Sequence, residues 1–210
     1  MNTPTLEMQN NYTNFLLSHV LPAYELDGDQ FLNALELSGG AMAGSAAVQC
    51  VLRSKHWLCG DIDIFVADET DADIIGTFMG LMNYDEVWRG TADEETYSPS
   101  FAAAVQELRI YQSWMTWNGI GPSPGAGTAY EGAERLGAKT RVRRAVKVFV
   151  GMEALGAMDI DCCATTFKVV AHKSEWDVAG DLLRRRCNVG DEASAERRLK
   201  YESMGLDVHW

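Results

Sequence analysis

The chain has 210 residues, of which 47% are hydrophobic and 23% charged, a composition typical of a globular protein with a sizeable core. Its net charge of −12 disfavours non-specific binding to duplex DNA, because an acidic protein repels a long polyanion. No apolar run reaches the ~20 residues of a membrane-spanning helix, and residues 1–9 lack the pattern of a secretory signal, so we expect neither a membrane association nor export.

Apolar positions between residues 5 and 24 recur at helical spacing and predict an amphipathic helix that ends near Pro22. A second, short helix is expected over residues 30–34. Leu35 and Leu37 then alternate with polar neighbours, which predicts a short strand that ends at Gly39-Gly40. Residues 41–53 contain Ala, Met, Val and Leu without proline and predict a buried helix.

Residues 61–66 alternate and are rich in β-branched and aromatic side chains, which predicts a strand. A helix with an acidic first turn is expected over residues 71–82. The stretch 84–140 combines acidic, aromatic and Gly/Pro-rich parts, and we interpret it as an insertion. Beyond it the patterns predict strands at residues 143–150, 158–163 and 167–172. Helices are expected at residues 174–186 and 193–204, and Gly205 closes the last helix.

This order of elements predicts a mixed α/β (α+β) protein. We expect one domain over residues 1–210, in which a small mixed sheet is flanked by helices. Its core would comprise residues 30–83 and 141–206, separated by the insertion 84–140.

The five cysteines are odd in number and lack Cys-x-x-Cys spacing, which predicts neither a disulfide framework nor a structural zinc site. This usage indicates a reducing compartment, the cytoplasm. The adjacent Cys162 and Cys163 have no neighbouring histidine, so we expect them to be buried packing residues.

The negative charge is concentrated in the first part of the chain. Residues 1–134 carry 4 Lys/Arg and 19 Asp/Glu, whereas residues 135–210 carry 14 and 11. The basic clusters at 135–147 and 184–200 are suited to a small anion or a short RNA, such as a tRNA end. They are equally typical of solvated helix and strand faces.

Asp61 and Asp63 are two residues apart on the expected strand, so their carboxylates share one face. Two like charges at this distance repel, and hard oxygen ligands for a divalent cation such as Mg²⁺ would relieve the repulsion. The preceding turns, Gly39-Gly40 and Gly44-Ser45, offer backbone N–H groups near a helix start, which suits a triphosphate. We place the strand-ending turn at Gly39-Gly40, with Gly44-Ser45 as the alternative.

The segment LSGGAMAGSAAVQCVLRSKHWLCGDIDIFV (residues 37–66) resembles the signature of the DNA polymerase β-like nucleotidyltransferase superfamily. In that signature a hydrophobic-Gly-Gly/Ser turn and a helix precede an Asp-hydrophobic-Asp-hydrophobic strand. The chain is more narrowly similar to nucleotidyltransferase-fold proteins of large DNA viruses, phages and fungi, where a tryptophan often precedes this strand, as Trp57 does here. Two later segments resemble other parts of the same proteins, VKVFVGMEALGAMDIDCCATTF (residues 146–167) and ERRLKYESMGL (residues 196–206).

The resemblance implies a polymerase-β-like fold and a Mg²⁺-dependent enzyme that moves a nucleoside monophosphate from an NTP to a hydroxyl on RNA, a protein or a small molecule. Asp61, Asp63 and Asp159 would be its catalytic carboxylates and would ligate two Mg²⁺ ions. Asp159 would also help to deprotonate the acceptor, and Asp161, on the same face of its expected strand, is the alternative third acid.

The resemblance also implies a nucleotide-binding set. Gly39, Gly40 and Ser45 would hold the β- and γ-phosphates. Lys147 or Arg144, on the strand before the third acid, would offset phosphate charge. The alternative function is a catalytically inactive protein of viral or fungal origin that uses the same fold to bind a nucleotide or a partner protein. A third, weaker option is a transferase that modifies tRNA ends.

Overall fold

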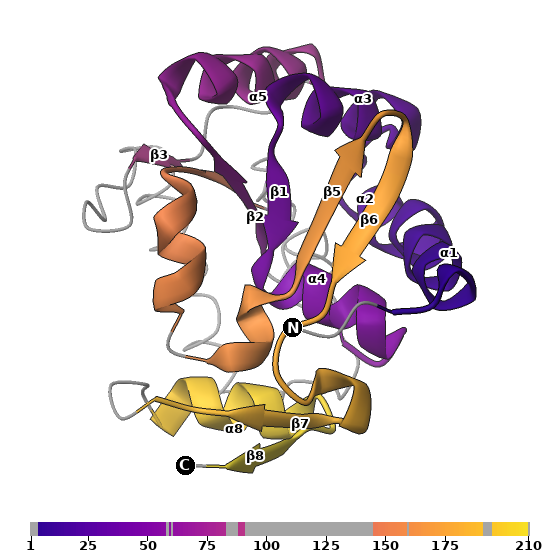
Figure 1. Cartoon of the computed structure of the whole chain (residues 1–210), viewed down its shortest axis with the longest axis vertical. Coiled ribbons are helices and arrows are strands. Elements are labelled where there is room, and N and C mark those ends of the chain that lie inside the picture. The colour runs from indigo at the N-terminus through magenta and orange to yellow at the C-terminus, as the bar shows by residue number, and fades with distance from the viewer. Residues whose placement is uncertain are drawn as a thin grey trace, which may run out of the picture.

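The computed structural model describes residues 4–57, 59, 61–82, 88–90, 145–158, 160–190 and 195–209. Within these ranges a mixed sheet has the strand order β3-β4-β2-β1-β5-β6, and helices flank it (Figure 1). Its strands are Ala41–Ala43 (β1), Asp61–Val66 (β2), Trp88–Gly90 (β3), Ala145–Val150 (β4), Thr166–Val170 (β5) and Lys173–Asp177 (β6). The expected mixed α/β class is therefore confirmed.

Strand β2 lies inside the sheet, between an antiparallel β1 and a parallel β4. Asp63 is level with Ala43 of β1 and with Lys147 of β4. Because residues at one level of a sheet point to the same side, Asp61, Asp63 and Lys147 share one face. The stacked rings of Phe65 and Phe149, whose centroids are 4.6 Å apart, lie further along that face.

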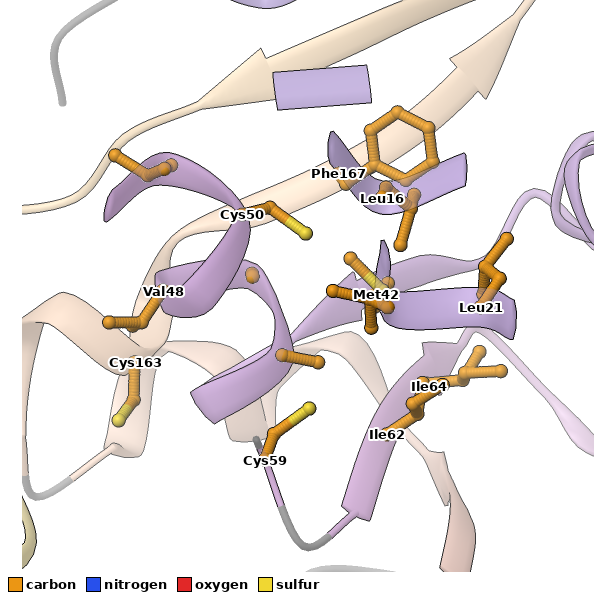
Figure 2. Packing of buried hydrophobic residues seen from close by; sticks show 14 of the residues in the cluster. Leu16, Leu21, Met42, Val48, Cys50, Cys59, Ile62, Ile64, Cys163 and Phe167 are labelled. Atoms are coloured by element: carbon orange, nitrogen blue, oxygen red, sulfur yellow. The ribbon is translucent and has the colours of Figure 1, made fainter. Parts of the chain in front are cut away.

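The opposite face of the sheet packs against helices. Ile62 and Ile64 of β2 lie beside Met42 of β1, and Phe167 of β5 continues the same apolar layer (Figure 2). Val48 and Cys50 bring the helix Gly44–Leu52 (α4) into this core. Burial of this layer provides the main driving force for the fold.

The N-terminal helical segment is confirmed. It consists of Leu6–Phe15 (α1), a π-helical turn Leu16–Val20 (η1) and Leu21–Ala23 (α2). Thr5 caps it by accepting a hydrogen bond from the Met8 N–H, and Pro22 lies near the end of the segment, just after the π-helical turn. Helix α1 packs beside β6, at the edge of the sheet (Figure 1).

The predicted strand at Leu35–Leu37 is wrong, because these residues belong to a helix, Gly28–Ser38 (α3). Its buried residues Phe31, Ala34, Leu35 and Ser38 have helical spacing, whereas Leu37 is exposed. Asp27 caps the first turn. The strand lies further along, at β1, so the helix expected over 41–53 begins only at Gly44.

The helix expected at 71–82 is confirmed as Glu69–Leu81 (α5), capped by the Asp68 carboxylate. The strand expected at 143–150 is confirmed as β4. Strand β3, inside the range interpreted as an insertion, extends the sheet beyond β4. The rest of 84–140 lies outside the described residues.

The C-terminal part differs most from expectation. The strand expected at 158–163 is not found among the described residues of this range: Ile160 makes one bridge to Val189, and Asp161–Ala164 is a 3-10 turn (η3). The helix expected over 174–186 is also wrong, because β6 pairs with β5 and a 3-10 turn, Leu182–Arg184 (η4), follows.

The helix expected over 193–204 is confirmed as Ala195–Ser203 (α8), and Gly205 follows it with a φ of 82°. A small parallel sheet of Arg186–Asn188 (β7) and Asp207–His209 (β8) closes the described chain. In Figure 1 these three elements lie together below the main sheet.

Candidate functional site

The turn between β1 and α4 lies against the carboxylate of Asp63. Gly44, the first residue of α4, has a φ of +67°, and a Cβ on it would overlap Asp63 Oδ2. Both the backbone conformation and the close approach therefore require glycine at this position. The antiparallel pairing of Ala43 with Asp63 is what brings the turn and the carboxylate together.

The loop that leads into β2 is tied to α4 by one buried side chain. Gln49 Nε2 donates to the carbonyl oxygens of Ser54 and Trp57, at 3.0 and 2.6 Å. Gln49 Oε1 in turn accepts a hydrogen bond from the Cys59 N–H at 3.1 Å. These bonds hold the entry to β2, and with it Asp61, in a fixed position relative to the helix.

The first turn of α4 has unused hydrogen-bonding capacity. Ala43, which precedes it, provides no side-chain cap. Ser45, in this turn, is 3% exposed, and its Oγ has no hydrogen-bond partner in the part of the chain that the structure describes. Buried hydroxyls and N–H groups at a helix start usually have partners, so this turn is suited to an anion such as a phosphate.

Lys147 brings a positive charge to the same face. Its Nζ lies 2.8 Å from Asp61 Oδ2, and the two side chains are 20% and 24% exposed. The site thus combines two carboxylates, one ammonium and an uncapped helix start. Of the seven residues that the sequence singled out, Asp61, Asp63, Ser45 and Lys147 are on or next to this face.

The two glycines predicted to hold phosphates lie elsewhere. Gly39 has a φ of +59° and ends α3, with its N–H donating to the Glu36 carbonyl. The Gly40 N–H donates to the Leu35 carbonyl and to Ser38 Oγ. These hydrogen bonds form a helix C-terminal cap, so the strand-ending turn is Gly44-Ser45 and the choice of Gly39-Gly40 is corrected.

The predicted third acid, Asp159, lies outside the described residues. The alternative, Asp161, accepts hydrogen bonds from the N–H and the Nδ2 of Asn188, at 2.8 and 2.7 Å. A Cβ on Gly180 would also overlap its carboxylate. Asp161 therefore joins η3 to β7, a structural role that the strand pattern at 158–163 did not predict.

The carboxylate pair suits a metal that arrives with its substrate. No group of three or more His, Cys, Asp or Glu suited to holding a metal ion occurs within the described ranges. Mg²⁺, however, is commonly bound by one or two carboxylates together with substrate phosphates and water. Asp61 and Asp63 share one face, and Asp63 lies against the first residue of α4, an arrangement that would suit that mode.

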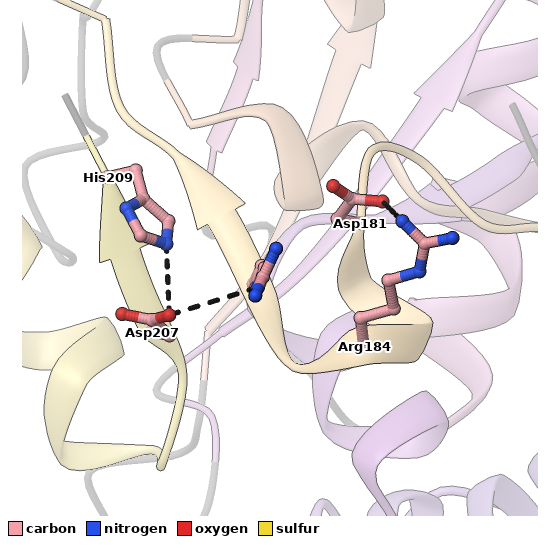
Figure 3. A network of polar contacts seen from close by, with 5 residues as sticks. Asp181, Arg184, Asp207 and His209 are labelled. Atoms are coloured by element: carbon pink, nitrogen blue, oxygen red, sulfur yellow. Dashed lines mark hydrogen bonds and ion pairs between the residues drawn. The ribbon is translucent and has the colours of Figure 1, made fainter.

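Part of the second basic cluster is paired with carboxylates (Figure 3). Arg184 contacts Asp181 at 3.4 Å, and Arg186 contacts Asp207 at 3.9 Å, on the side of β7 and β8. Arg198 and Glu202 form a further pair along α8. These contacts favour a solvated face over an RNA-binding surface at 184–200. Of the first cluster, residues 135–144 are not among those described, and Arg144 is one of them.

The cysteines are not part of the site. All five lie in the described ranges, are buried and are not joined in disulfides. Burial raises the pKa of the Cys50 thiol well above its usual value, because the thiolate would be desolvated. Cys163 Sγ lies 2.8 Å from the Tyr201 hydroxyl. The expected packing role of Cys162 and Cys163 agrees with their burial.

A large open hollow of about 1010 Å³ lies on another part of the molecule, between α1 and the β5–β6 hairpin. Its lining includes Asn10, Asn14 and Lys168 but neither Asp61 nor Asp63. We place the candidate site at the carboxylates, because there a glycine turn that lies against a carboxylate coincides with charged groups, whereas the lining of the hollow includes neither aspartate.

Among the described helices, none has the length and apolar character needed to cross a bilayer. Comparison of the chain with models of protein families, with curated proteins and with solved structures finds no match.

Proposed function

We propose that the chain is a Mg²⁺-dependent nucleotidyltransferase of the polymerase-β-like type, which moves a nucleoside monophosphate from an NTP to a hydroxyl acceptor on RNA, a protein or a small molecule. One observation carries the proposal: the Asp63 carboxylate lies against Gly44 at an uncapped helix start, on the same face as Asp61. A metal-bridged phosphate requires this proximity of carboxylates and N–H donors.

In the proposed enzyme, N–H and hydroxyl groups would contact the phosphates, and the carboxylates would contact the metal. The first-turn N–H groups of α4 and Ser45 Oγ would donate to phosphate oxygens, whose negative charge the helix dipole would also favour. Asp61 and Asp63 would hold Mg²⁺, which would supply charge neutralisation at the reacting phosphate. Asp159 is retained as the proposed third carboxylate on the sequence resemblance alone.

In the reaction, the acceptor oxygen forms a bond to the α-phosphorus of the NTP, the bond from that phosphorus to the bridging oxygen breaks, and pyrophosphate leaves. The acceptor hydroxyl proton passes to a base, the role proposed for Asp159. The rigid strands of the sheet would hold the carboxylates in place during the transfer, so positioning and electrostatics supply the catalysis.

The direct test is a calorimetric titration with ATP and the other NTPs, with and without Mg²⁺. Nucleotide binding that requires Mg²⁺ and is lost in Asp61→Asn and in Asp63→Asn is expected. Asp29→Asn, the same change at an exposed position in the first turn of α3, is the matched control and should bind as the wild type does. Binding that survives both site changes would remove the assignment.

The second candidate function, a catalytically inactive protein that uses the fold for binding, is favoured by the Lys147–Asp61 pair. The ammonium already neutralises a carboxylate that the proposed enzyme needs for metal. Incubation with radiolabelled ATP, Mg²⁺ and candidate acceptors separates the two functions. Mg²⁺-dependent nucleotide binding without release of pyrophosphate, across RNA, protein and small-molecule acceptors, would favour the inactive protein.

A further inference from the structure

The Lys147 ammonium lies beside Asp61, the carboxylate that would bind a metal cation in the proposed enzyme. Lys147 is level with Asp63 on the neighbouring strand, yet its Nζ reaches Asp61 Oδ2 at 2.8 Å. Its chain neighbours Val146 and Val148 are buried on the other face of the sheet. The Lys147 ammonium therefore offsets the negative charge of Asp61.

We infer that Lys147 is an internal counter-cation, which competes with a divalent metal for Asp61 and moves to the phosphates when a nucleotide binds. This inference rests on the proposed function for the identity of the nucleotide. It makes Lys147 a positioning and binding residue that couples the two ligands, so that metal and nucleotide bind together more readily than either binds alone.

Charge explains the competition. A divalent cation at Asp61 would lie within a few ångströms of the Lys147 ammonium. Like charges this close repel, and they do so more strongly near a protein surface than in bulk water. A metal that binds without a nucleotide must therefore break the ion pair between Lys147 and Asp61.

A bound triphosphate removes that obstacle. Its oxygens provide a new anionic partner for Nζ, and lysine has a flexible four-carbon stem that carries a compact charge with three donors. The pairing of β4 with β2 fixes the position of the Lys147 backbone. The side chain therefore changes partner by rotating about its own bonds. The nucleotide then frees Asp61 for the metal.

The experiment measures Mn²⁺ and ATP binding separately, with Mn²⁺ as a spectroscopic probe whose free form is counted by electron paramagnetic resonance. For Lys147→Met, we expect Mn²⁺ alone to bind about tenfold more tightly, since the competing charge is gone. ATP in the presence of saturating Mn²⁺ should bind about tenfold more weakly, since one phosphate partner is gone. Lys147→Gln should show the same two changes, tighter Mn²⁺ binding and weaker ATP binding.

Two controls separate this role from a general charge effect. Lys168→Met removes the same charge from β5, in another part of the sheet, and should leave both affinities unchanged. Lys147→Arg keeps the charge and should keep Mn²⁺ binding weak. Thermal unfolding of each variant confirms that it is folded.

The outcomes also distinguish this inference from the proposed function. Tighter Mn²⁺ binding by Lys147→Met supports the competition even if the chain binds no ATP, and in that case the proposed function fails alone. Unchanged or weaker Mn²⁺ binding by both folded neutral variants overturns the inference, whether or not ATP binds. Undetectable Mn²⁺ binding by the wild type and by both variants overturns it as well.

Discussion

Two glycine-containing turns, Gly39-Gly40 and Gly44-Ser45, lie five residues apart and have opposite roles. The first ends a helix: its N–H groups donate to the last carbonyls of α3, and Gly39 adopts a φ of +59° in open space. The second begins a helix: Gly44 adopts a φ of +67° against the Asp63 carboxylate, and the following hydroxyl has no described partner. Two turns of similar composition therefore differ. The N–H groups of the first donate within the end of α3, whereas the second begins a helix against a carboxylate.

The difference is set by the elements on either side. A C-terminal cap follows a helix and consumes its own N–H groups, whereas a strand-to-helix turn leaves the first N–H groups of the new helix pointing outward. The pairing of β1 with β2 then brings these donors to the carboxylates. Under the proposed function, a glycine-containing turn indicates an anion site where a strand precedes it.

The largest effect that would test this comparison is expected for Gly44→Ala. The added methyl group meets a positive φ and overlaps Asp63, so we expect a loss of about 3 kcal/mol in the free energy of unfolding. Urea unfolding measures the loss. Mn²⁺ binding should weaken as well, because the carboxylate must move.

Gly39→Ala is the matched control for this change. Its φ is also positive, but no atom lies within 4 Å of the added Cβ. The expected loss is about 1 kcal/mol, from backbone strain alone, with metal and nucleotide binding intact. Equal losses for the two variants would show that the contact with Asp63 contributes nothing.

A pair of buried serines sharpens the comparison further, because one belongs to each turn. Ser38 Oγ donates to the Leu35 carbonyl and accepts from the Gly40 N–H, so Ser38→Ala should destabilise the protein by about 1 kcal/mol. Ser45→Ala removes a hydroxyl that has no partner among the described residues, and it should stabilise the free protein by about 1 kcal/mol.

Nucleotide binding provides the second measurement for the same two variants. Ser45→Ala should weaken ATP binding about tenfold, as the loss of a hydrogen bond to a charged group does. Ser38→Ala should leave that affinity unchanged. A Ser45→Ala protein that is less stable than the wild type would indicate that this hydroxyl has a structural partner, and would argue against an anion site.

The sequence predicted the β2 strand and its same-face aspartates because alternation over six residues is a strong local signal. It misplaced the turn because Leu35 and Leu37 alternate over only four residues, and the helical spacing of Phe31, Ala34, Leu35 and Ser38 was the longer pattern. The role of Lys147 beside Asp61 depends on strand register, which forms only when distant segments pair.

The C-terminal errors have a different cause. The helix expected over 174–186 is wrong because no glycine, asparagine or proline marks the turn between β5 and β6 in the sequence. The connection is the dipeptide Ala171-His172, and both residues have positive φ, at 47° and 61°. Asn or Gly usually occupies such hairpin positions. Here Glu36 fixes the turn from α3, since its carboxylate oxygens lie 2.8 Å from the His172 N–H and Nδ1.

That hairpin gives the smallest expected effect, with a sign opposite to that of Gly39→Ala. Ala171→Gly relieves the strain of a left-handed alanine, of about 1–2 kcal/mol, but increases the entropy of the unfolded chain. We expect a net stabilisation of about 0.5 kcal/mol, measured as a higher urea midpoint at an unchanged slope. Ala34→Gly, in the middle of α3, should instead lose about 1 kcal/mol. If both alanine variants lose stability, then the positive φ at Ala171 imposes no strain, and the strain assigned to Gly39→Ala must be reconsidered with it.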